Sequence, residues 1–222
     1  MKALMQLYWP FAAASLLGLA FLCAHGFWAG HGSFLFLFWN LGLAWCPVIL
    51  GEAVVQARSR TFLWTAFPCW LLSFPNAPYL ATDLVHLGSR GDALWWGDVL
   101  LLAFFAGLGC LLACLSLFRI HGWLGWRLSG RATWLVLACI CLLTGLGMYL
   151  GRFLRWSSWD VFRDPLVLFG GLAERALAPW EHPRMLAFTL SWSLLLFAGY
   201  GMIFTLVRFG WRNGPPAGRG AY

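Results

Sequence analysis

The chain has 222 residues, 61% of them hydrophobic and only 10% charged, and it carries a formal net charge of +7. This composition excludes an ordinary soluble domain, and the scattering of basic residues between apolar runs argues against nucleic-acid binding. Because a membrane-spanning helix needs about 20 apolar residues, the length predicts an all-α, polytopic transmembrane helix bundle with about six spans. We expect a single transmembrane domain over residues 1–207.

The first two spans are expected at residues 8–28 and 34–55. The first is longer than the apolar core of a signal peptide, so we interpret it as a retained anchor. The second contains Asn40 and Glu52. We expect Asn40 to hydrogen-bond to another helix, and Glu52 to be neutralised by Arg58 or Arg60 in the following loop.

The third span, at residues 62–81, is interrupted where the chain reads Phe74-Pro75-Asn76-Ala77-Pro78-Tyr79-Leu80-Ala81-Thr82-Asp83. Proline lacks a backbone N–H and does not continue a helix, so the prolines predict a break in the outer half of the membrane. A helix can restart at Pro78, because proline is tolerated at the first helical position. On that helix Tyr79, Asp83 and His86 recur at i, i+4 and i+7, which places a phenol, a carboxylate and an imidazole on one face.

Three further spans are expected at residues 99–118, 132–150 and 185–207. Gly147 and Gly151, near the end of the fifth span, are a small-xxx-small pair that permits close helix approach. The connection from Arg152 to Arg184 is predicted to contain one interfacial or re-entrant segment, since its apolar run is short and broken by glycines. Residues 208–222, rich in Gly, Pro and Arg, are expected to form a disordered basic tail.

The distribution of charge predicts the orientation of the bundle. Six spans place both termini and the loops after the second and fourth spans on one side, which carries most of the basic residues of the short segments and, of the acids, only Glu52. The positive-inside rule therefore places both termini in the cytoplasm. Nearly all the acids then lie at or near the outer face.

A second polar cluster, Gly151-Arg152-Phe153-Leu154-Arg155-Trp156-Ser157-Ser158-Trp159-Asp160, follows the fifth span. Arg152 and Arg155 are i, i+3 neighbours on a continuing helix, and counting from the cytoplasmic ends puts both clusters at a similar depth. Each cluster alone fits a structural explanation: a proline kink wetted at the interface, or arginines reaching up to lipid phosphates. Together they favour a site, because ionisable groups at a helix break inside a membrane are often functional.

Several polar residues of the two clusters are candidates for substrate binding: Asn76, Tyr79, Asp83, His86, Arg152, Arg155 and Asp160. The candidate catalytic residues are His86 as a general base and Asp83 as the group that orients it. No motif of a known hydrolase or phosphate loop accompanies this pair, so whether the protein is an enzyme stays open. A metal site there needs further ligands, and we expect neither a metal nor a cofactor.

The two segments 74–83 and 151–160, in this order, resemble the uncharacterised bacterial membrane-protein family known as domain of unknown function 1361. The resemblance extends over most of the chain and implies a multi-pass bacterial membrane protein. It also implies an asparagine at the position that Ser157 occupies here, where this chain departs from the family. The family supplies no activity.

The leading functional hypothesis is an inner-membrane protein that binds an anionic, phosphate-bearing lipid or lipid-linked substrate in an outward-facing polar pocket, where Arg152 and Arg155 hold the anion. One alternative is a small transporter or flippase gated at the broken third helix. Another is a non-catalytic assembly subunit that packs against a membrane-protein partner or a second copy of itself. In all three cases membrane lipids surround the protein.

Overall fold

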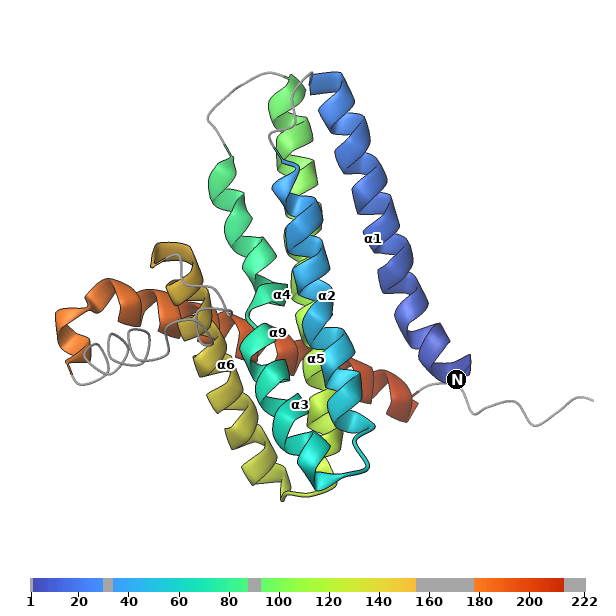
Figure 1. Ribbon diagram of the computed structural model, residues 1–222, viewed down its shortest axis with the longest axis vertical. Helices are drawn as coiled ribbons and strands as arrows, with labels where there is room; N and C mark the ends of the chain where they lie inside the picture. Colours follow the sequence, from blue (N-terminus) through green and yellow to red (C-terminus); the bar gives the residue numbers. More distant parts are fainter. Residues whose placement is uncertain (1, 30–33, 88–92, 155–177, 214–222) are drawn as a thin grey trace, which may run out of the picture.

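The computed structural model describes residues 2–29, 34–87, 93–154 and 178–213 (Figure 1). Its elements, in chain order, are α1 (Lys2–Ala29), α2 (Phe36–Val55), α3 (Arg60–Ser73), α4 (Asn76–Tyr79), the 3-10 helix η1 (Leu80–His86), α5 (Ala93–Gly125), α6 (Gly130–Phe153), the 3-10 helix η2 (Pro179–Glu181) and α9 (Pro183–Asn213). Within these ranges there is no strand, and five helices are long and apolar enough to cross a membrane. The predicted all-α membrane helix bundle, with its third span broken, is confirmed.

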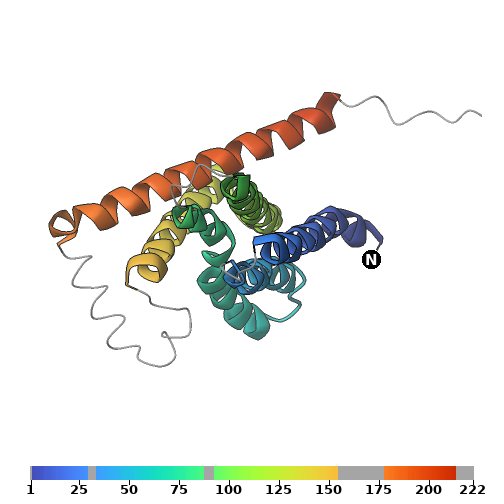
Figure 2. The same ribbon diagram turned by 90° about the horizontal axis from the view of Figure 1, so that it is seen from above.

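The longest helix, α5, lies at the centre of the bundle. α1, α2, α4 and η1 pack along it, and α3 packs against α2 (Figure 1). α6 makes its largest contact with α9, which runs across the other helices at a steep angle along one side of the bundle (Figure 2). α9 therefore has the length and composition of a span but does not run alongside α1, α2 and α5.

The helices extend beyond the apolar stretches that mark them in the sequence. The expected spans 8–28, 99–118 and 132–150 correspond to α1, α5 and α6, each of which adds polar residues at its ends. Backbone hydrogen bonds continue through polar residues until a capping residue or a glycine ends the ladder. Ser59 and Ser129 cap the beginnings of α3 and α6, since their side chains accept hydrogen bonds from the N–H groups of Phe62 and Ala132.

The helix at the end of the chain is longer than the sequence predicted. The last span was expected over residues 185–207, but α9 continues to Asn213, so residues 208–213 are helical and the prediction of a disordered tail is wrong for them. Phe209, whose apolar side chain is exposed, continues the membrane-compatible surface of α9 beyond residue 207. Residues 214–222 and most of the predicted interfacial segment, residues 155–177, lie outside the described residues.

The broken segment is held between two glycines. A Cβ added to Gly109 of α5 would collide with the carbonyl oxygen of Ala77 and would lie 2.8 Å from Leu80 Cβ. A Cβ added to Gly147 of α6 would lie 2.8 Å from Pro75 Cγ. The absence of side chains at both positions lets the broken segment approach α5 and α6 closely.

The close crossing of α6 and α9 depends on a different glycine from the expected pair. A Cβ on Gly145 would lie 2.5 Å from both the Thr189 carbonyl oxygen and Ser193 Oγ. The small-residue prediction named Gly147 and Gly151, whereas Gly145 makes the contact with α9 and Gly147 contacts the break. Residue spacing alone does not say which face of a helix meets which neighbour.

A polar cluster near the end of α2 joins α1, α2 and α5. Glu52 accepts hydrogen bonds from Tyr8 and from Arg119, whose second nitrogen lies 3.0 Å from Glu52 Oε2. Gln56 Nε2 donates to the same oxygen at 3.1 Å. The expectation that Arg58 or Arg60 neutralises Glu52 is wrong: both arginines are exposed, and the cation comes from α5, which extends through Arg119 as a helix instead of ending in a basic loop.

Candidate functional site

Asp83 lies at the junction of three helices. It exposes only 1% of its surface, although it carries a carboxylate. Asn40 Nδ2 of α2 donates to Asp83 Oδ2 at 2.9 Å, and Arg152 of α6 donates to Asp83 Oδ1 at 3.4 Å. A buried carboxylate is stable only when it is paired or hydrogen-bonded, and here both oxygens have partners. The two polar clusters of the sequence therefore meet through Asp83 and Arg152.

Arg152 is surrounded by the side chains of the broken segment. A guanidinium nitrogen lies 3.4 Å from His86 Nε2, and the guanidinium carbon lies 5.9 Å from the centre of the Tyr79 ring, within the range of a cation–π contact. The Arg152 side chain is 19% exposed, whereas that of Asp83 is 2% exposed. Both 3.4 Å contacts are longer than an optimal N–H···O bond. Arg152 is thus positioned by the broken segment while part of its side chain remains at the surface.

His86 is exposed and stands at the edge of this cluster. Its ring lies 5.1 Å from the Phe36 ring of α2, between centroids, at an interplanar angle of 57°. When Arg152 donates to Nε2, the proton of the neutral imidazole must be on Nδ1. Among the residues that the structure describes, no hydrogen bond joins His86 to Asp83, because Arg152 lies between them. The contact by which Asp83 could orient His86 as a general base is absent there.

The shared face of Tyr79, Asp83 and His86 arises from a tighter helix than the sequence pattern indicated. Residues 80–86 form a 3-10 helix, in which side chains three residues apart eclipse each other, so Asp83 and His86 align at i, i+3. Thr82 Oγ1 donates to the Tyr79 carbonyl at 2.7 Å, which satisfies a backbone acceptor at the junction of α4 and η1. The alignment holds although the helix type differs.

Among the residues that the structure describes, the other candidates make no hydrogen bond to Asp83 or Arg152. Asn76 begins α4, and within the described ranges no side-chain hydrogen bond involves it. Arg155 and Asp160 lie outside the described residues. Asn40, in contrast, contacts Asp83 directly but was predicted only to join helices. The signal that could have identified it is an amide placed about a third of the way into an otherwise apolar span.

The described part of the chain contains no group of three or more His, Cys, Asp or Glu side chains able to hold a metal ion. His25 Nε2 of α1 lies 3.1 Å from Asp98 Oδ1 of α5, where Gly97 leaves room for the imidazole. This pair connects α1 to α5 and stands apart from the Asp83 cluster.

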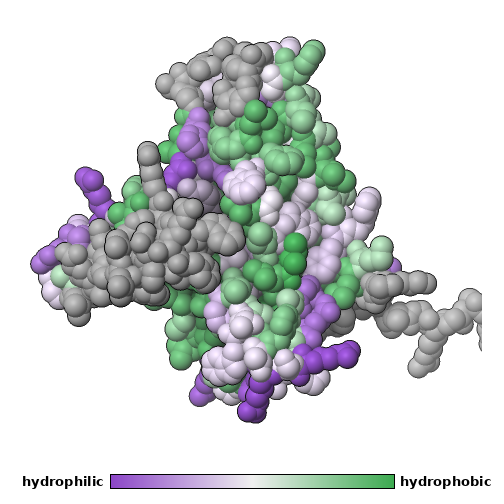
Figure 3. Space-filling model, in the orientation of Figure 1, coloured by the Kyte–Doolittle hydropathy of each residue, from purple (hydrophilic) through white to green (hydrophobic). Residues whose placement is uncertain are grey.

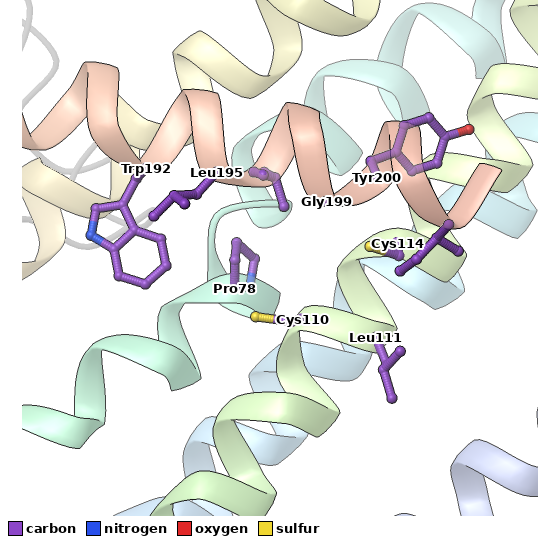
Figure 4. A pocket seen from close by; sticks show the side chains of 10 residues that line it. Pro78, Cys110, Leu111, Cys114, Trp192, Leu195, Gly199 and Tyr200 are labelled. Carbon is purple, nitrogen blue, oxygen red and sulfur yellow. The ribbon is translucent and has the colours of Figure 1, made fainter. Parts of the chain in front are cut away.

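A cavity lies on another side of the broken segment. It has a volume of about 190 Å³, lies between α4, α5 and α9, and is open on one side (Figure 4). Pro78 lines it, whereas Asp83, His86 and Arg152 do not. The cavity is apolar, so it does not correspond to the polar pocket that the sequence predicted.

The surface and the fold together define the class of protein. Figure 3 shows a largely hydrophobic band across the helices, with hydrophilic groups at the lower end and beside the upper end of the broken third helix. Long apolar helices whose backbone groups are satisfied internally are the structures that span membranes. The protein is an integral membrane protein with several membrane-length helices.

The chain belongs to the family described as protein of unknown function (DUF1361), whose match covers residues 39–198. The match includes Asn40, the whole broken segment and Arg152, and it leaves α1 outside. No curated protein and no solved structure matches the chain.

Proposed function

We propose that this protein binds an anionic, phosphate-bearing lipid or lipid-linked substrate through Arg152 and His86, beside the broken third helix. The observation that supports the proposal is the partly exposed guanidinium of Arg152, held by buried Asp83 on one side and by His86 at the surface on the other. A planar guanidinium binds phosphate oxygens in a bidentate manner. Asp83, which is itself held by Asn40, positions the Arg152 guanidinium without using all of its donors.

The balance of charge at the cluster suits a weakly held anion. The Asp83 carboxylate and the Arg152 guanidinium compensate each other, so neither is an unpaired charge. Exposed His86 offers a ring nitrogen as a hydrogen-bonding group beside the phosphate. We further propose that Arg155 adds a second guanidinium and that Asn76, Tyr79 and Asp160 shape the site.

We also propose that the site faces outward from a bacterial cytoplasmic membrane, as the positive-inside rule indicates. Val85 of η1 is 68% exposed beside the site, and Arg58 is exposed in the loop before α3. In a cysteine-free variant, Val85→Cys should react with a membrane-impermeant maleimide added to whole cells, and Arg58→Cys should react only after lysis. The reverse pattern would show that the orientation is wrong.

Binding itself can be tested by native mass spectrometry of the purified protein. We expect wild-type protein to retain phosphatidylglycerol in preference to phosphatidylcholine, and Arg152→Gln to reduce that preference about tenfold, as the loss of a charged hydrogen bond implies. Arg119→Gln is the matched control, because it breaks the Glu52 ion pair on the same bundle. An unchanged preference in Arg152→Gln, or an equal loss in Arg119→Gln, would contradict the proposal.

A further inference from the structure

The apolar cavity is formed by small side chains on facing helices. Cys110 and Cys114 stand one turn apart on α5, opposite Gly199 of α9, and larger apolar side chains close the sides: Pro78, Leu111, Trp192, Leu195, Leu196 and Ile203. Tyr200 also lines the cavity, but its hydroxyl lies 2.7 Å from His121 Nδ1 and is directed away from Pro78 and Cys110 (Figure 4). The surface that lines the cavity is therefore almost entirely apolar.

The surroundings of the cavity determine what can fill it. An apolar cavity of this kind does not hold water, which needs polar partners. Two of the helices around it, α5 and α9, have the length and composition of membrane spans, so hydrocarbon is the medium next to it. Its volume suits a stretch of one unbranched chain. An acyl chain is the occupant that fits these conditions.

The cavity and the polar cluster share one short helix. Pro78 forms a wall of the cavity, while the next residue, Tyr79, contacts Arg152. Gly109, which contacts Leu80, immediately precedes Cys110 on α5, so the cavity lies at the level of α4. Asp83 and His86 follow in η1 towards the start of α5. A headgroup at Arg152 and a chain at Pro78 would therefore both lie against α4, with the polar end nearer the start of α5.

We propose that the cavity binds an acyl chain of the same anionic phospholipid whose phosphate is held by Arg152 and His86. The inference rests on the proposed function and narrows its ligand class to a phosphate-bearing diacyl lipid. The α4 segment then contacts both parts of one ligand, with Pro78 against the chain and Tyr79 beside the phosphate site.

Two glycines of α9 provide a matched test. A Cβ on Gly199 or on Gly201 meets nothing within 4 Å, so a side chain can begin at both positions without a clash, but only Gly199 lines the cavity. Binding of dioleoyl phosphatidylglycerol and of glycerophosphoglycerol, the same headgroup without chains, is measured for each variant. Gly199→Leu should weaken binding of the dioleoyl lipid by about fivefold, since a chain entering from lipid gains packing contacts only.

The remaining measurements distinguish the proposed acyl-chain site from the proposed headgroup site. Gly199→Leu should leave glycerophosphoglycerol binding unchanged, Gly201→Leu should change neither ligand, and Arg152→Gln should weaken both. Wild-type affinity of Gly199→Leu for the dioleoyl lipid, or an equal loss in Gly201→Leu, would overturn the acyl-chain site. If Arg152→Gln binds both ligands normally, the headgroup proposal fails instead. Equal thermal unfolding midpoints of the two glycine variants exclude a folding defect as the cause.

Discussion

Arg152→Ala is expected to lower the free energy of unfolding by about 3 kcal/mol, because it leaves the buried Asp83 carboxylate without its cation. Asp83 keeps only the hydrogen bond from Asn40, and its side chain is 2% exposed, so water does not replace the guanidinium. Unfolding in mixed micelles measures the effect. Arg131→Ala is the control on the same helix, since Arg131 is exposed and should change stability by less than about 0.5 kcal/mol.

The partner substitution distinguishes a paired charge from a general packing defect. Asp83→Ala should cost less than Arg152→Ala, because the long arginine side chain is already partly exposed and can turn towards water. Combining the two should recover part of the loss, since neither charge is then buried alone. Strictly additive losses in the double variant would show that the two side chains do not interact.

Gly109→Ala is expected to destabilise the protein by about 3 kcal/mol and to displace the broken segment from α5. The added Cβ would collide with the Ala77 carbonyl oxygen, which belongs to the backbone and cannot rotate away, and overpacking of this kind typically costs about 1–3 kcal/mol. Movement of α4 also shifts Asp83 relative to Arg152, so the preference for anionic lipid should fall with stability.

Gly107→Ala is the control for that substitution. It lies on the same helix two residues away, and a Cβ there meets nothing within 4 Å. Alanine has a higher helix propensity than glycine, by up to about 1 kcal/mol, so Gly107→Ala should be neutral or slightly stabilising. If the two alanine variants unfold alike, α4 is not seated against Gly109.

The sequence predicted the elements that depend on local chemistry. Apolar runs identified the spans, and the prolines of the third span identified the break. The alignment of Asp83 with His86 was also foreseen, although the helix there is tighter than an α-helix. These features depend on residues close together in the chain, where periodicity and missing backbone donors carry the information.

Contacts between helices were harder to foresee. Glu52 forms its ion pair with Arg119 and not with Arg58, which is nearer in the sequence. The rotation of α5 against α2 determines which arginine side chain faces Glu52. The steep crossing of α9 depends on the close fit of Gly145 against Thr189 and Ser193, which hydropathy does not register. The hydrogen bond from Asn40 to Asp83 was equally hard to predict, because it depends on how α2 packs against η1.

The most direct test of lipid recognition at the broken helix is photo-crosslinking with phosphatidylglycerol that carries a photoreactive group on its headgroup. After cross-linking in nanodiscs and peptide mapping, we expect adducts concentrated in residues 79–87 and 147–154, with a phosphatidylcholine analogue giving far fewer. Adducts spread evenly over the exposed faces of α1 and α9, or equal labelling by the two headgroups, would contradict the site.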